Sequence, residues 1–211
     1  NSMAEALRIK GELQEARELV DRAFRILLDA FGKDHPDVAG VLRNMAHINR
    51  RLGKYEAAEV SARSALKSLK QTLGSTHEQV ADAYACLSDV YKARGQTEKA
   101  LAHATDALEA YRRGLGRDHP LTAIQLNRTA LLHADLEQYA EAEDLFRRSI
   151  TAREQIYGPD HPRVAAVLEN YARVLEATGR TERAAELKQR AERIWDAFLA
   201  EHKAETNETS E

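Results

Sequence analysis

The chain has 211 residues, of which 31% are charged and 43% hydrophobic, with only 4 prolines and 10 glycines, a composition typical of a soluble, mostly helical protein. Its formal net charge of −3 argues against a nucleic-acid partner, because nonspecific binding usually requires a strongly basic face. The sequence has one cysteine, no signal-peptide core and no run of about 18 uncharged apolar residues, so we expect a cytoplasmic protein that neither spans nor binds a membrane.

A repeat of 42 residues is the strongest signal in the sequence. In each copy a large side chain precedes a glycine, and a histidine follows at a fixed offset. Self-similarity at such a period predicts stacked helical units that bury their apolar faces against one another. The marker residues are Phe31, Gly32 and His35, then Leu73, Gly74 and His77, then Leu115, Gly116 and His119, then Tyr157, Gly158 and His161.

Residues 1–30 are predicted to be a partial unit that begins inside a repeat. Gly11 and Ala16 stand one period before Gly53 and Ala58, which places a turn at Gly11 and leaves the first helix of this unit cut short. The uncapped end would expose apolar side chains, through which the chain could form a homo-oligomer. These side chains are Met3, Leu7 and Ile9.

The first complete unit is predicted to be a helix, a tight turn and a second helix. Apolar or small residues follow a helical spacing from Val38 to Leu52, Gly53 ends that helix, and the same spacing resumes from Tyr55 to Leu69. Pro36 suits a first helical turn, because the N–H that it lacks would be unpaired there, and Asp34 is the predicted N-cap.

The later copies match this unit position by position, and Gly53 recurs as a glycine in all but the third, which has Glu137. The second copy lacks the Asp-His-Pro start, and Ser75 and Glu78 are expected to form a capping box there. The sequence therefore predicts an all-α fold, a right-handed α-solenoid of antiparallel helix pairs. Its units span residues 31–72, 73–114, 115–156 and 157–198.

Residues 1–200 are predicted to form one continuous array, since the repeat register runs unbroken along the chain. The last helix carries Ile194, Trp195 and Phe198, as expected of a helix that caps the final unit. The segment that follows is charged and poor in apolar residues, so residues 201–211 are predicted to be a disordered tail.

These units resemble the tetratricopeptide repeat, and their length and opening sequence are similar to those of the kinesin light chain type. The resemblance covers nearly the whole chain and is carried by FGKDHPDVAGVLRNMA at 31–46, LGRDHPLTAIQLNRTA at 115–130 and YGPDHPRVAAVLENYA at 157–172. It implies that the first helix of each unit lines a concave wall. Repeats of this type occur in cargo adaptors, signalling proteins and sensor arms of large ATPases, so the resemblance does not fix one task.

Polar residues on the non-core face of the first helices are the predicted binding site. Asn44 and Asn170 are expected to hold the main chain of a peptide, because an amide offers both donors and an acceptor. The arginines would pair with acidic side chains or a terminal carboxylate. In the alternative, Arg173 only forms solvated pairs with Glu169 and Glu176, worth a few tenths of a kcal/mol. The predicted groove residues are Arg43, Asn44, His47, Arg50, Asp89, Asn127, Arg128, Asn170 and Arg173.

No catalytic or metal-binding constellation is evident in the sequence. The periodic histidines stand a helix pair apart, and even neighbouring axes lie about 8–10 Å from one another, whereas ligands of one metal lie about 2 Å from it. We therefore expect the histidines to fix the helix starts. Cys86 has acidic neighbours, which disfavour a reactive thiolate, and acids of the second helices, such as Glu59 and Glu143, are expected on a solvated face. Without a phosphate-binding loop, nucleophile elbow or HExxH motif, we expect no enzyme, metal or cofactor.

Three functions remain open. The first is a non-catalytic interaction module or adaptor that binds an extended peptide segment of a partner protein in the concave groove. It predicts that charge reversal at Arg43 or Arg128 abolishes binding without lowering the melting temperature. The second is a regulatory receptor or sensor arm for a small peptide or metabolite, whose binding changes the curvature of the array. The third is a self-assembling scaffold.

Overall fold

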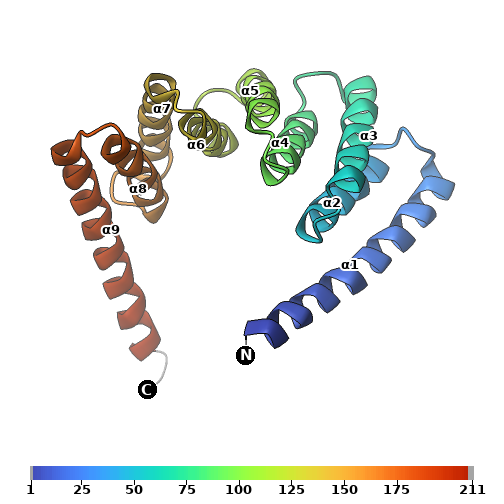
Figure 1. Cartoon of the computed structure of the whole chain (residues 1–211), viewed down its shortest axis with the longest axis horizontal. Coiled ribbons are helices and arrows are strands. Elements are labelled where there is room, and N and C mark those ends of the chain that lie inside the picture. Colours follow the sequence, from blue (N-terminus) through green and yellow to red (C-terminus); the bar gives the residue numbers. More distant parts are fainter. Residues whose placement is uncertain (1, 209–211) are drawn as a thin grey trace. The chain divides into compact units, whose positions relative to one another are not determined.

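The computed structural model describes the backbone of residues 2–208 and the side chains of residues 11–201. Within that range the chain forms α-helices and no strand, and none of these helices is long and apolar enough to cross a membrane (Figure 1). The expected all-α fold of helical repeats is confirmed. In chain order the helices are α1 (Ser2–Phe31), α2 (Pro36–Arg51), α3 (Tyr55–Leu73), α4 (Glu78–Ala93), α5 (Thr97–Gly114), α6 (Pro120–Asp135), α7 (Tyr139–Tyr157), α8 (Pro162–Ala177) and α9 (Thr181–Glu208).

The chain divides into two compact units, where the sequence predicted one continuous array over residues 1–200. Each compact unit contains more than one of the 42-residue repeats. The first unit is residues 1–114, with α1 to α5, and the second unit is residues 115–211, with α6 to α9. The division falls at a predicted repeat boundary, between the second and third complete copies. The division therefore does not cut through a repeat.

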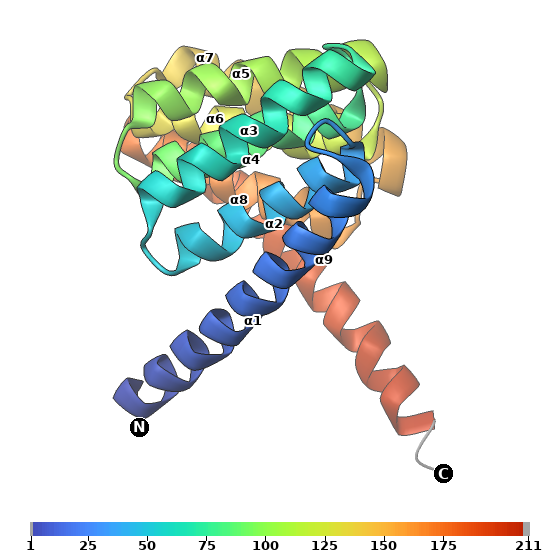
Figure 2. The same cartoon turned by 90° about the vertical axis from the view of Figure 1, so that its right-hand side faces the viewer.

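In the first unit, α2 pairs with α3 and α4 pairs with α5, while α3 packs on α4 and α1 packs on α2. The first helices of the two repeats, α2 and α4, also contact each other directly. They form the inner layer of this unit, and the second helices form its outer layer. Figure 2 shows α1 packed at one end on α2 and extending beyond it.

The second unit repeats this order of layers. α6 pairs with α7 and α8 pairs with α9, while α7 packs on α8 and the first helices α6 and α8 contact each other. The inner layer of the unit is therefore α6 and α8, and the outer layer is α7 and α9. Ring stacking adds to its core, where Phe146 and Tyr171 have centroids 5.7 Å apart.

A left-handed residue joins the two helices of each pair. Gly53, Gly95 and Gly179 have φ angles of 74°, 75° and 76°, which glycine adopts without a steric penalty. Glu137 stands at the equivalent position with φ 59°, where a side chain costs about 1–2 kcal/mol. The third copy thus keeps the turn with a residue that does not favour it.

Small side chains fill the contacts between helices. Ala58, Ala62 and Ala65 of α3 are completely buried, and the register gives α5 alanines at the same places. A small side chain lets two helix backbones approach closely, so the repeat is held by backbone proximity as much as by large apolar groups. One such cluster joins α2, α3 and α4 and consists of Ala39, Ala65, Leu69, Val80 and Ala83.

The periodic histidines lie at the starts of the first helices, as expected, and they are the N-caps. The ring Nδ1 of His35 accepts the backbone N–H of Asp37 at 3.2 Å. Equivalent bonds of 3.2, 3.2 and 3.1 Å start α4, α6 and α8. Each bond satisfies one of the N–H groups that have no partner within the helix. The histidines therefore have a structural task, and among the described residues no cluster of histidine, cysteine and acids could hold a metal ion.

Two predicted caps are wrong. Asp34 lies one residue before the observed cap of α2, which is His35. In the second copy Glu78 is the first residue of α4 and His77 is its cap, so the capping box with Ser75 does not form. The reason is the same in both places: an imidazole at the cap position already reaches the N–H group two residues on.

The two terminal segments also differ from the sequence-based expectations. α1 runs without a break through Gly11, where a turn was predicted. A glycine inside a helix destabilises it by only about 1 kcal/mol relative to alanine. A turn at Gly11 would give up backbone hydrogen bonds of the helix, which costs more unless the preceding segment packs back against the helix that follows. α9 continues to Glu208, into the segment expected to be disordered. The side chains of Met3, Leu7 and Ile9 lie outside the described residues.

Candidate functional site

The predicted wall of the first unit contains an ion pair that belongs to the fold. Arg43 of α2 pairs with Asp82 of α4, and the second carboxylate oxygen of Asp82 accepts the hydroxyl hydrogen of Tyr111 from α5. Both charged side chains are about a quarter to a third exposed, at 24% and 32%. Arg43 therefore ties α2 to α4, so we now expect its charge reversal to lower the melting temperature, unlike the expectation from the sequence.

The other predicted residues of this wall are spread along α2 and α4. Asn44 and His47 are exposed one turn apart on α2. Arg50 is half-buried on the same helix, and its Nε atom is buried without a hydrogen-bond partner. Asp89 is half-buried on α4. Of the predicted groove residues of this unit, only Asn44 and His47 are thus largely exposed.

The wall of the second unit brings three predicted residues into one hydrogen-bonded chain. The Asn170 Nδ2 group of α8 donates to Asn127 Oδ1 of α6 at 3.1 Å, and the Arg173 guanidinium donates to Asn170 Oδ1. Arg128, next to Asn127, is half-buried. The bond between the two amides crosses from one first helix to the next, so it fixes both amides on the inner layer.

The solvated pairs considered for Arg173 do not form. Glu169 accepts the indole N–H of Trp195 from α9 at 2.9 Å, and Glu176 pairs with Lys188 at 2.6 Å. Both acids therefore face α9. Arg173 is oriented by Asn170 instead.

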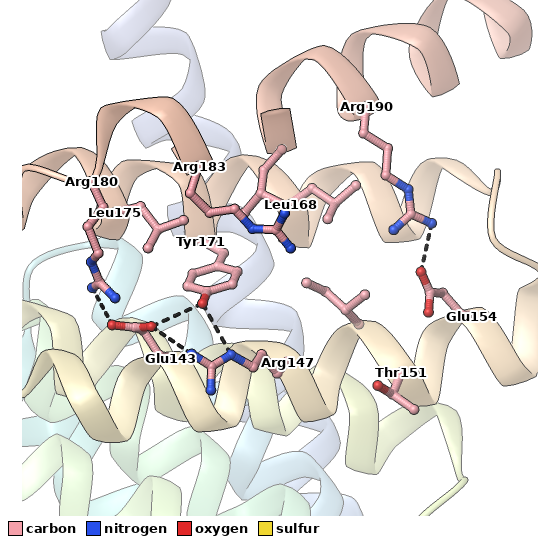
Figure 3. Close-up of a pocket in the computed structure, with 12 residues that line it drawn as sticks. Glu143, Arg147, Thr151, Glu154, Leu168, Tyr171, Leu175, Arg180, Arg183 and Arg190 are labelled. Carbon is pink, nitrogen blue, oxygen red and sulfur yellow. Dashed lines mark hydrogen bonds and ion pairs between the residues drawn. The ribbon is translucent and has the colours of Figure 1, made fainter. Parts of the chain in front are cut away.

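A second polar site lies in the outer layer of the second unit. A cleft of about 510 Å³ runs between α7 and α9, with α8 as its floor (Figure 3). Leu168, Tyr171 and Leu175 of α8 form the floor, and Ile150 and Leu187 contribute from the two sides. The rim carries guanidinium groups from α7, from α9 and from the turn before α9. They belong to Arg147, Arg180, Arg183 and Arg190.

Glu143 is the centre of the polar network at one end of this cleft. Its carboxylate accepts the Tyr171 hydroxyl hydrogen at 3.0 Å and an Arg147 N–H at 2.9 Å, and it pairs with Arg180 (Figure 3). The bond from Arg180 lowers the pKa of Glu143 against the opposing effect of burial, and burial raises the pKa of Tyr171. This network joins α7, α8 and the start of α9.

A second ion pair closes the other end of the cleft. Arg190 of α9 pairs with Glu154 of α7 at 2.7 Å and also donates to the carbonyl oxygen of Pro159 at 3.0 Å. The two networks hold the outer helices at a fixed separation over α8. They leave the space between them open to solvent.

The first unit has a related network around Glu59 of α3. Its carboxylate accepts the Tyr91 hydroxyl hydrogen at 2.7 Å and lies 2.9 Å from Arg94 and 3.1 Å from Arg63. The expectation that Glu59 and Glu143 lie on a solvated face is therefore wrong. Each glutamate is followed four residues later by an arginine, and the two pairs stand two periods apart. This recurrence in the sequence could have indicated that the two glutamates form ion pairs.

The only cysteine is buried in α4, which agrees with an unreactive thiol. Burial removes Cys86 from oxidants and from partner proteins alike.

A family model of the tetratricopeptide repeat matches the chain four times, over residues 1–71, 37–113, 79–155 and 122–197. These overlapping matches cover most of the sequence. No match is found among curated protein sequences.

Solved structures show the same fold. BtubC (BKLC) from P. vanneervenii superposes with a TM-score of 0.81 at 23% identity, covering 93% of this chain and 78% of that one. A putative kinesin light chain from Podosopora anserina with nearly identical repeats gives 0.78 at 21% identity, with 93% of each chain covered. A Rap protein complexed with Competence and Sporulation Factor gives 0.67 at 16% identity, over 89% of this chain and 51% of that one. At these identities the likeness concerns the fold alone.

Proposed function

Since the chain belongs to the tetratricopeptide repeat family, we propose that it is a non-catalytic protein-interaction module that binds an extended peptide segment of a partner protein along its first helices. The observation that carries this proposal is the hydrogen-bonded chain of Arg173, Asn170 and Asn127 on α8 and α6. A cytoplasmic location and a protein partner are parts of the same proposal.

The two amides suit a peptide backbone for a geometric reason. An asparagine amide carries two N–H donors and one acceptor oxygen, and the bond between Asn170 and Asn127 uses only one donor of the first and one acceptor position of the second. The remaining donors have a fixed direction because the side chains are already held together. A peptide that binds them loses less side-chain entropy than it would with unrestrained amides.

Arg173 adds a charge to this site. Its guanidinium is exposed on α8 and is oriented by the Asn170 oxygen. A carboxylate of the peptide, either a side chain or a C-terminus, could form a charge-assisted bond with it. The proposed ligand is therefore an extended segment with an acidic group next to a stretch of free backbone.

The test uses peptides selected from a random library on the whole chain, with their affinities measured by fluorescence anisotropy. The variant Asn127→Ala/Asn170→Ala removes both amides, and we expect it to weaken binding about tenfold or more, as the loss of two hydrogen bonds in a binding site implies. The control is Gln155→Ala, which removes an exposed amide from α7. Equal affinity of the double variant and the wild type, at unchanged melting temperature, would overturn the proposal.

A further inference from the structure

The cleft between α7 and α9 carries exposed arginines, and the anion at one of its ends, Glu143, is buried. The side chains of Arg147 and Arg183 are 64% and 65% exposed, whereas Glu143 beneath them is only 9% exposed. Glu154, the other acid of the lining, is 31% exposed and is held by Arg190. A molecule that enters the cleft therefore meets guanidinium groups first.

The charges of the lining do not cancel. Four arginines and two glutamates line the cleft, which leaves an excess of two positive charges. Arg183 also pairs with Glu186 on its own helix, but both groups are largely exposed, at 65% and 61%. Such surface pairs contribute little stability, so Arg183 can exchange this partner for a ligand at small cost.

The floor of the cleft is apolar. Leu168 and Leu175 of α8 are almost completely buried, and Leu187 of α9 lies beside them, 8% exposed. The half-buried Ile150 completes the α7 side. An apolar side chain seated between the outer helices would contact these groups while carboxylates on either side reached the rim.

The full set of cleft arginines does not recur in the first unit. On α3 and α5 the positions of Arg147 and Arg183 keep a cation, Arg63 and Lys99, but Arg190 is replaced by Asp106. A cleft between α1 and α3 over α2 has a volume of about 600 Å³ and is lined by Phe24 and Leu28 where the second unit has Ile150 and Glu154. The register positions of Arg147, Arg183 and Arg190 are occupied there by Asp21, Ala57 and Ser64.

We propose that the cleft between α7 and α9 binds an acidic peptide segment, whose carboxylates pair with Arg147 and Arg183 and whose apolar side chain lies over the floor of the cleft. Arginine matches a carboxylate with two parallel N–H donors, which favours this chemistry over a single point contact. This site is on the outer layer and is separate from the amide chain of α6 and α8. It can be occupied whether or not the inner wall binds a peptide.

The probe is a short fluorescein-labelled peptide of glutamates around a central leucine, and binding is followed by anisotropy. The cleft variant is Arg147→Ala/Arg183→Ala. Its matched control is Arg148→Ala/Arg193→Ala, which removes one exposed arginine from each of the same helices outside the cleft. Both variants change the net charge equally, so a difference between them reports contact and not the long-range field.

We expect the cleft variant to bind the probe at least about tenfold more weakly, and the control to change affinity less than about twofold. Because Arg147 also contacts Glu143, Arg183→Glu is measured as a second variant that leaves this network intact, with the same expected loss. Equal losses in the cleft and control variants, or no binding of the probe to the wild type, would overturn the proposal. The variant Asn127→Ala/Asn170→Ala should bind the probe normally, which separates this site from the inner wall.

Discussion

The networks around Glu59 in the first unit and Glu143 in the second unit both join a second helix to the next first helix, but they use tyrosines from different positions of the repeat. Both glutamates lie on a second helix with an arginine four residues later, and both accept a hydroxyl hydrogen from a tyrosine of the next first helix. The tyrosines, however, are not register equivalents. Tyr91 corresponds to Leu175, and Tyr171 corresponds to Leu87.

The difference shows that the repeat specifies a location for a polar contact but not the residues that complete it. A hydroxyl can reach the same carboxylate from two turns of the first helix, so a tyrosine at either place suffices. The two other second helices that precede a repeat depart further. α1 has Arg17 and Asp21, with the charges reversed, and α5 has Leu101 and Thr105.

The largest effect is expected where the carboxylate is most buried. Glu143→Ala leaves Arg180 and the Tyr171 hydroxyl without their partner, and the loss should be about 2–3 kcal/mol in the free energy of unfolding. Glu59→Ala should cost less, about 1–2 kcal/mol, because the Glu59 side chain is 20% exposed and water can replace it. Urea unfolding of both variants measures the difference. Equal costs would mean that burial does not distinguish the two networks.

The inner walls of the two units invite a second comparison. Arg43→Glu places a carboxylate against Asp82 and removes the link between α2 and α4, so we expect a loss of about 1–2 kcal/mol in stability. Asn44→Glu, one residue further on and exposed, should change stability by less than about 0.5 kcal/mol. The melting temperatures of the two variants measure this contrast. A stable Arg43→Glu protein would restore Arg43 as a residue available only for binding.

Periodicity was sufficient to predict the helix pairs and the turns within the complete repeats, since each depends on residues that recur at a fixed spacing. It placed the histidines at the helix starts but did not identify them as the caps. It placed Asn127, Asn170 and Arg173 on one wall, and the structure joins them. It did not reveal the pairing of Arg43 with Asp82, because that contact links positions that are not register equivalents. The buried state of Glu143 was missed for a similar reason: the tyrosine that buries it has no counterpart one period away.

A smaller change in stability is expected from the left-handed turn residues, which differ between the two units. Glu137→Gly relieves the left-handed strain in the second unit, and we expect a gain of about 1 kcal/mol, reduced somewhat by the greater freedom of glycine in the unfolded chain. Gly95→Glu makes the opposite change in the first unit and should cost about the same. Thermal melting of the two variants tests the pair. A loss of stability on Glu137→Gly would show that the side chain makes a compensating contact.

The smallest expected effect is on how stability depends on pH, and the loss of stability should appear at different pH values in the two units. Burial lowers the pKa of His103 from its ordinary value of 6.5, against the attraction of Asp106 3.7 Å away and of Glu59, and with added repulsion from Arg63. As the pH falls through about 6.5, His103 takes up a proton in the unfolded chain but stays neutral in the folded chain. The first unit therefore loses stability in this pH range.

Glu143 acts at lower pH because Arg180 lowers its pKa from 4.5. Its contribution is complete above about pH 4.5 and is lost as the pH falls further through the pKa of the folded state. His103→Phe keeps an aromatic ring against Tyr91, whose centroid lies 5.3 Å away, and removes the titrating group. We therefore expect the variant to lose the decline in melting temperature that begins below about pH 6.5 while keeping the decline below about 4.5. If the upper decline persisted in His103→Phe, it could not be assigned to His103.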